Sequence, residues 1–260
     1  SGLMEMYGPS MQKRFNPGPA ARNGLTAAQM AKHGFTGAAT IFEGERGFCR
    51  AFSDEIDIDA LTRNLGAEYP IHIEYKAYSC ARPIHNAIDC ALAVRAQLKE
   101  PVAAIKSMIM RRHLTWANYH LNTRPKTYHE AQVSLPYSVA VALVEGAALF
   151  PQYRNEKLAD PELRRLMDML KVVVDDTLPR GVSCHLTAET TGGAKLESQV
   201  DHPKGSIANP MSDDEMRRKV HLLGDPVLGA DQVTRMIASI DDVESLESIA
   251  TLARLTAPEA

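Results

Sequence analysis

Residues 71–98 read IHIEYKAYSCARPIHNAIDCALAVRAQL, and this stretch decides the fold prediction for the chain. Apolar and polar residues alternate over 71–75, which is typical of a half-buried strand. From about Ile84 to Leu98 apolar residues recur at helical spacing, so a helix is expected there. A strand that leads directly into a helix indicates that a new structural unit starts near residue 72.

Helical patterns lie on both sides of this point. From Gly24 to Phe52 small and apolar residues recur at helical spacing and glycines interrupt them, which predicts short helices separated by turns. Beyond Asn209-Pro210, Ser212 and Glu215 have the spacing of a capping box that starts a helix. Two further helices are expected between Asp231 and Leu255.

The middle of the chain mixes strand and helix patterns. Strands are expected at 104–110, 170–175, 182–189 and 194–200, and helices around 128–144 and 160–169. We therefore predict a discontinuous all-helical domain with an inserted smaller α+β lid domain. The helical domain would be formed by residues 1–71 and 209–260, and the lid by residues 72–208.

Bulk properties favour a globular protein and argue against nucleic-acid and membrane partners. The chain has 260 residues, of which 45% are hydrophobic, and this is enough for a sizeable core. A net charge of -3 argues against a nucleic-acid partner, and no apolar run reaches the roughly 20 residues that span a membrane. Four scattered cysteines without a C-x-x-C pair indicate reduced thiols, with no zinc site. A cytoplasmic protein is the expectation.

Two segments gather chemically active side chains. Lys13 precedes a Pro/Gly turn that opens a helix, where free backbone N–H groups can also meet an anion, although a solvated lysine is the plainer interpretation. Residues 76–85 place two cations, a phenol, a thiol and an imidazole at the strand-to-helix junction. An arginine there can bind a carboxylate bidentately. His85 and Asp89 could face one metal ion, but such a pair is more often an ordinary helix-surface contact.

A third segment contains Glu130, Ser134 and Tyr137 at spacings of four and three, so all three can share one helical face. Pro136 must kink or restart that helix, which can direct Tyr137 to a special position. The alternative is that Tyr137 belongs to a core stripe with a polar rim.

Taken in order, these segments resemble the MmgE/PrpD superfamily, which includes 2-methylcitrate dehydratase, cis-aconitate decarboxylase and iminodisuccinate epimerase. The resemblance covers nearly the whole chain. It rests on five stretches: the lysine and turn of residues 12–21, then residues 34–48, 76–85 and 130–137, and finally Asn209-Pro210 with its capping box.

The resemblance implies an active site in the cleft between the helical domain and the lid, no metal or organic cofactor, and a homodimer. Its implied reaction is dehydration, decarboxylation or epimerisation of a small di- or tricarboxylic acid, through proton abstraction next to a carboxylate. By matching positions, the implied catalytic residues are Lys13, His85 and Tyr137. The implied substrate-binding residues are Lys76, Arg82, Asn16 and Tyr78.

The chain departs from the family pattern at three positions. Asn16 stands where many relatives have histidine, Pro19 replaces a frequent arginine, and Ala81 occupies a position that is often cysteine or histidine. The family's first helical segment, with further catalytic groups, has no counterpart before Ser1. We therefore expect the C-terminal part of an enzyme, with a partner chain as one source of the missing segment.

Two alternatives come from other classes of protein. The first is a non-catalytic or split paralogue that binds a small acid at most and acts as a partner subunit. A hydrolase that uses serine or cysteine ranks third, because the sequence contains no Gly-x-Ser-x-Gly elbow.

Overall fold

The computed structural model describes residues 15–69 and 71–258, so the predicted site residue Lys13 lies outside the described residues. Backbone proximity divides the chain into two compact units, residues 1–71 and residues 72–260. The predicted joining of residues 209–260 with residues 1–71 in one helical domain concerns the relation between these units, and it stays a prediction.

The first unit consists of short helices joined by turns, in the pattern that its glycines and apolar residues predict. Pro17 stands in the first turn of α2, where its missing N–H removes no helical hydrogen bond, and Gly34 takes a φ of 86° just beyond the helix end. The elements are α2 (Pro17–Lys32), α3 (Phe48–Phe52) and the 3-10 helix η2 (Ile58–Leu61). Among the described residues of this unit only Gly47 is buried, so they contain no apolar core of their own.

The predicted strand at residues 71–75 is wrong. Its backbone is extended but joins no sheet in the described part of the chain, and Ile71, Ile73 and Tyr75 are 70%, 56% and 46% exposed. One hydrogen bond of 2.8 Å, from the Tyr75 N–H to the Gly205 carbonyl, fixes the end of this segment. Alternation predicts an extended backbone, whereas a strand also needs a partner, and the sequence pattern does not reveal whether one exists.

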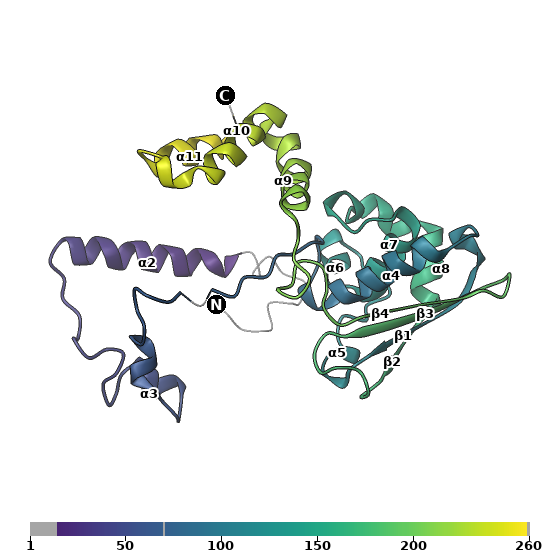
Figure 1. Cartoon of the computed structure of the whole chain (residues 1–260), viewed down its shortest axis with the longest axis horizontal. Coiled ribbons are helices and arrows are strands. Elements are labelled where there is room, and N and C mark those ends of the chain that lie inside the picture. The colour runs from purple at the N-terminus through teal and green to yellow at the C-terminus, as the bar shows by residue number, and fades with distance from the viewer. Residues whose placement is uncertain (1–14, 70, 259–260) are drawn as a thin grey trace. The chain divides into compact units, whose positions relative to one another are not determined.

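The second unit contains a four-stranded sheet in the order β2-β1-β3-β4 (Figure 1). All four strands expected in the middle of the chain are present, with ends that differ by at most two residues from the prediction. They are β1 (Ile105–Arg112), β2 (Leu170–Val174), β3 (Cys184–Thr190) and β4 (Lys195–Val200). The pair β1 and β2 is parallel and the other two pairs are antiparallel, so the chain between β1 and β2 must cross over the sheet.

Three helices cover one face of this sheet and form the core with it (Figure 1). They are α4 (His85–Gln97), α7 (Leu135–Glu145) and α8 (Pro161–Met169), and the two short helices of the crossover are α5 (Leu114–Ala117) and α6 (Tyr128–Ala131). Ile84 and Ile88 at the start of α4 are fully buried, and each such side chain contributes about 1.5–3 kcal/mol through burial. The second unit is therefore α+β with a continuous apolar core.

The helical pattern predicted for residues 128–144 forms two helices. Helix α6 ends at Ala131 and α7 begins at Leu135, because Pro136 cannot donate a backbone hydrogen bond and fits only in the first turn of a new helix. The Ser134 hydroxyl caps α7 by accepting the Tyr137 N–H at 3.1 Å.

The tail of the chain is helical, as predicted. Its elements are α9 (Asp213–Leu228), α10 (Ala230–Asp241) and α11 (Ile249–Leu255). The predicted capping box is present, since the Ser212 hydroxyl accepts the Glu215 N–H and the Glu215 carboxylate accepts the Ser212 N–H. Gly224 lets α9 approach α10 closely, because a Cβ there would lie 2.8 Å from a methyl group of Val233.

All four cysteines are free thiols: Cys49 is partly exposed, whereas Cys80, Cys90 and Cys184 are buried in the second unit. Within residues 15–69 and 71–258, no three side chains of the kinds that bind metals come together in one place. None of the helices in these ranges combines the length and the apolar character of a membrane span.

Candidate functional site

The strongest concentration of polar side chains without ordinary partners lies at the N-terminal end of α4. Here Lys76 and Tyr78 precede the 3-10 turn η3 (Arg82–Ile84), and His85 is the first residue of α4. Lys219 reaches the same place from α9. We call these five residues, Lys76, Tyr78, Arg82, His85 and Lys219, the α4 cluster.

A buried arginine in the core of the second unit fixes the position of the η3 turn. Arg112 at the end of β1 is fully buried, and its guanidinium donates to the Pro83 carbonyl at 2.7 Å and to the Trp116 carbonyl at 2.8 Å. Because an arginine in the core is costly unless its donors are used, these bonds fix the turn to the sheet. The positions of Arg82 and His85 are therefore set by the packed part of the unit.

His85 is fully buried, and neither ring nitrogen has a hydrogen-bond partner of normal geometry among the described residues. Burial lowers the pKa of His85 to about 3, and the positive charges of Arg82, Lys76 and Lys219 contribute, while the nearby backbone of Cys80 opposes the shift. The imidazole is therefore neutral at pH 7. It can give or accept one hydrogen bond at each nitrogen, and a negative charge placed beside it would raise its pKa.

Arg82 uses only part of its guanidinium. One terminal nitrogen, Nη2, pairs with the Glu74 carboxylate at 2.8 Å, whereas Nε and Nη1 are buried and have no partner among the described residues. Unused donors in a buried position are uncommon in folded proteins and cost about 1–3 kcal/mol each. The N–H groups of Nε and Nη1 point to different sides of the guanidinium, so they do not form a fork for one carboxylate, but each can donate a charge-assisted hydrogen bond to an anionic ligand.

Tyr78 contributes its ring to the cluster and directs its hydroxyl elsewhere. The hydroxyl donates to the Asp89 carboxylate, which also accepts the backbone N–H of Lys204 at 2.8 Å. Burial, followed by the charge of Asp89, raises the pKa of Tyr78. The ring lies edge-on to His85, with 5.2 Å between the ring centroids. Asp89 is thus occupied by Tyr78 and Lys204, and this arrangement offers no support for a metal ion shared with His85.

Lys219 is a member of the cluster that the sequence analysis missed. Its ammonium group donates to the Lys76 carbonyl, and burial, followed by the charge of Lys76, lowers its pKa. A signal for it exists in the sequence, because the capping box sets the register of α9 and places Lys219 one turn beyond Glu215 on the same face. Glu215 pairs with Lys204 at 2.8 Å, so this face of α9 is turned toward the loop that contacts α4.

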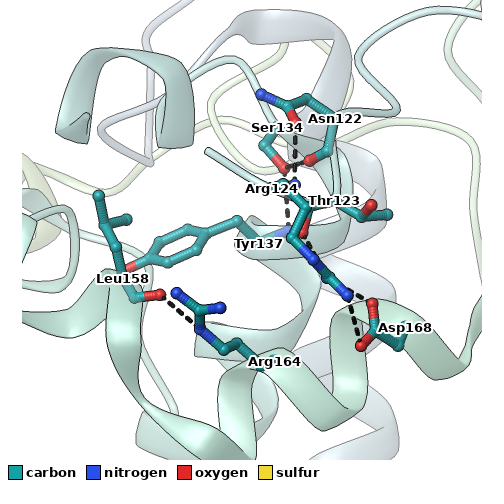
Figure 2. A network of polar contacts seen from close by, with 8 residues as sticks. All are labelled: Asn122, Thr123, Arg124, Ser134, Tyr137, Leu158, Arg164 and Asp168. Atoms are coloured by element: carbon teal, nitrogen blue, oxygen red, sulfur yellow. Dashed lines mark hydrogen bonds and ion pairs between the residues drawn. The ribbon is translucent and has the colours of Figure 1, made fainter. Parts of the chain in front are cut away.

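Tyr137 is not brought into the cluster. Its ring is fully buried in the core beside Tyr153, and its hydroxyl donates to the Gln152 carbonyl at 2.7 Å. Burial raises its pKa, with smaller contributions from Glu145 and Asp160. Figure 2 shows the ring of Tyr137 pointing toward Leu158, beside the polar network around Ser134. Its catalytic role stays a prediction that these contacts do not support.

The shared helical face expected for Glu130, Ser134 and Tyr137 does not exist. Glu130 belongs to α6, where its carboxylate accepts the Lys126 N–H at 2.9 Å. Ser134 caps α7 and donates to the Asn122 carbonyl at 2.5 Å (Figure 2). The helix restarts between them, so a pattern of spacings four and three no longer places the side chains in one row.

The remaining predicted residues belong to the first unit. Asn16 stands at the start of α2, and Lys13 lies outside the described residues. Whether either residue approaches the α4 cluster depends on how the two units meet, so both roles stay predictions. The structure brings together four of the seven predicted site residues, Lys76, Tyr78, Arg82 and His85.

Two family models match the chain. Residues 78–245 match the MmgE/PrpD C-terminal domain, and residues 1–60 match the MmgE/PrpD N-terminal domain. The first match contains all of the α4 cluster except Lys76.

The relatives are named as decarboxylases. Cis-aconitate decarboxylase from Mus musculus is 24% identical over an alignment of 255 residues, which covers 94% of this chain and 52% of the relative. Cis-aconitate decarboxylase-like protein oryM from Aspergillus oryzae is 26% identical over 280 residues, covering 99% of this chain and 57% of that protein. Cis-aconitate decarboxylase from Aspergillus terreus is 24% identical, covering 98% and 56%.

The chain thus spans little more than half the length of these relatives. The two family matches nevertheless account for 1–60 and 78–245 in the order expected from its sequence motifs. The longer match alone covers more than half of the 260 residues. This chain belongs to the MmgE/PrpD family.

Proposed function

We propose that this chain is part of a cofactor-independent lyase that acts on a small di- or tricarboxylic acid, and that the α4 cluster binds the carboxylates. The names of the relatives favour decarboxylation as the first reaction to test, with dehydration and epimerisation as alternatives. All three reactions pass through related carbanion or enol species, so a site that stabilises one can serve the others.

The observation that carries the proposal is the set of unused donors at the start of α4. Among the described residues, Arg82 has two buried nitrogens without a partner, and the fully buried neutral His85 adds one N–H donor and one acceptor nitrogen. Lys76 and Lys219 add positive charge at the same place. A ligand with carboxylate groups would accept from the arginine donors and balance the positive charges, whereas a neutral ligand would leave the charges unbalanced.

The chemistry of these residues fits a reaction next to a carboxylate. When a carbon–carbon bond to CO₂ breaks, its electron pair stays on the substrate and spreads into a neighbouring carboxylate, whose added charge needs fixed cations. Arg82 and Lys76 can supply those charges. A bound anion would also raise the pKa of His85 from about 3, so the imidazole can hold a proton when substrate is present and return it to the carbanion.

The direct test incubates the purified protein with cis-aconitate and measures released CO₂ together with the product spectrum by NMR. We expect CO₂ release that Arg82→Leu reduces by at least about 100-fold, since the lost charge-assisted hydrogen bonds stabilise both the substrate and the transition state. The matched control is Arg124→Leu, which also breaks an arginine–carboxylate pair, with Asp168, but outside the cluster. Equal activity in the two variants would contradict the proposed site.

A second candidate is a paralogue that binds a small acid without transforming it. The observation that favours it is Tyr137, whose hydroxyl is engaged by the Gln152 carbonyl. Calorimetric binding of cis-aconitate that depends on Arg82, without any CO₂, hydrated product or isomer, would establish this function.

A further inference from the structure

The C-terminal helices carry a positive charge into the α4 cluster in a defined way. The Glu215 carboxylate accepts the Ser212 N–H and pairs with the Lys204 ammonium, each at 2.8 Å. The backbone N–H of Lys204 is bound in turn by Asp89 of α4. The first turn of α9 is therefore linked to α4 through Lys204. Lys219 lies one turn after Glu215 on the same face of α9.

The charge arrangement around Lys219 is unusual for a structural lysine. Lys76 and Lys219 repel each other, yet neither ammonium forms an ion pair with a carboxylate among the described residues. Elsewhere on α9 the cation Arg217 does have such a partner, Asp241, at 2.7 Å. If Lys219 only attached α9 to the Lys76 carbonyl, the nearby charge of Lys76 would be unfavourable, because like charges repel.

A second observation points to an anion. His85 is fully buried, its two ring nitrogens lack hydrogen-bond partners of normal geometry among the described residues, and its environment is positive because Arg82, Lys76 and Lys219 all act on it. The lysine ammonium has three donors, and the Lys76 carbonyl uses one of them. Two donors of Lys219 therefore remain for a ligand that lies against the cluster.

We infer that Lys219 is a substrate-binding residue whose ammonium takes a second carboxylate, while Arg82 holds the first. This inference rests on the proposed function and deepens it in two ways. It makes the C-terminal helix α9 part of the site, and it assigns selectivity for acids with two or more carboxylates over monocarboxylates to one residue. A monocarboxylate pairs with Arg82 and leaves the charge of Lys219 without a partner.

The test compares the binding of two acids by titration calorimetry at low ionic strength. The probes are tricarballylate, a saturated tricarboxylate without a reactive double bond or hydroxyl group, and the monocarboxylate butyrate. We expect Lys219→Gln to weaken tricarballylate binding by about tenfold or more and to leave butyrate within about twofold, since a charge-assisted contact is lost only with the longer acid. Lys219→Arg should restore most of the preference.

The control Arg218→Gln removes the same charge from the exposed neighbouring position of α9 and should leave both affinities within about twofold of the parent protein. If Lys219 had only a structural role, Lys219→Gln would weaken the binding of both acids equally or of neither acid. Either result overturns the inference. Arg82→Leu distinguishes a failure of the Lys219 assignment from a failure of the proposed site. If it abolishes binding of both acids while Lys219→Gln keeps the full preference, only the role of Lys219 fails. If it changes neither affinity, the proposed site itself fails.

Discussion

His85 is the residue whose ionisation is tied most closely to the fold. Its pKa is lowered from 6.5 to about 3 by burial and by the cations around it, so the folded protein resists protonation that the unfolded chain accepts. The stabilising effect is fully present above pH 6.5. It is lost progressively as the pH falls from about 6.5 toward 3, because over this range only the unfolded state binds the proton.

The free energy of unfolding should therefore fall with decreasing pH in this window, by at most roughly 1.4 kcal/mol per pH unit from this one group. In His85→Gln the same window should show a shallower slope, since glutamine does not titrate. Urea denaturation at several pH values measures both slopes. The proposition fails if the parent protein and the variant have parallel curves between pH 6.5 and 3.

Tyr137 provides a second test at a single residue. Removing its hydroxyl in Tyr137→Phe leaves the Gln152 carbonyl without its donor and should lower the free energy of unfolding by about 1 kcal/mol. Tricarballylate binding should stay unchanged, because the hydroxyl belongs to the core contact and not to the α4 cluster. A loss of binding with unchanged stability would instead restore the catalytic role predicted from sequence.

At the level of elements, the loop at residues 201–209 holds the extended segment and α4 together. Gly205 has a φ of 87°, its carbonyl accepts the Tyr75 N–H, and a Cβ at this position would collide with the Tyr75 carbonyl oxygen. Gly193 also has a φ of 87° but faces open space. Alanine substitutions at the two glycines therefore distinguish the cost of a left-handed backbone from the cost of a steric collision.

Gly193→Ala should lower the free energy of unfolding by about 1–2 kcal/mol through the left-handed backbone alone. Gly205→Ala should lower it by clearly more, because the loop must also move away from Tyr75. Denaturant unfolding of the two variants measures the difference. Equal losses in both would show that the loop does not hold the extended segment in solution.

The elements also show what sequence patterns can and cannot predict. The four strands of the sheet follow from local sequence patterns, and the cap at Ser212 from short-range hydrogen bonding. The supposed strand at 71–75 fails because pairing depends on a distant partner. The helical face expected for Glu130, Ser134 and Tyr137 fails, and Lys219 is not singled out, for a related reason. The direction of a side chain depends on where its helix begins and on which segment the helix packs against. Residues distant in sequence determine that packing.

Many apolar side chains are exposed among the described residues of the first unit. Phe15, Phe35, Phe42, Phe48 and Phe52 are each more than half exposed in a unit whose described residues have no core. Apolar surface of this extent marks a region that contacts other protein. We therefore propose that the protein is a homodimer, with a partner chain of different sequence as the alternative.

Light scattering of the purified protein at micromolar concentration should give the mass of a dimer, twice 28.5 kDa for this chain. Phe52→Glu, at the most exposed of these rings, should shift the protein toward monomer, because a buried carboxylate in the interface is costly. A single monomer mass for the parent protein would refute the homodimer.

The four thiols give a way to watch the two units separately. Cys80, Cys90 and Cys184 are enclosed in the second unit, and burial raises the pKa of Cys80 to about 12 and of Cys184 to about 11, whereas Cys49 is partly exposed in the first unit. Alkylating reagents react with accessible thiolates. In native buffer a reagent should therefore modify Cys49 quickly, and the slow modification of the other three, followed by mass spectrometry, measures how often the core of the second unit opens.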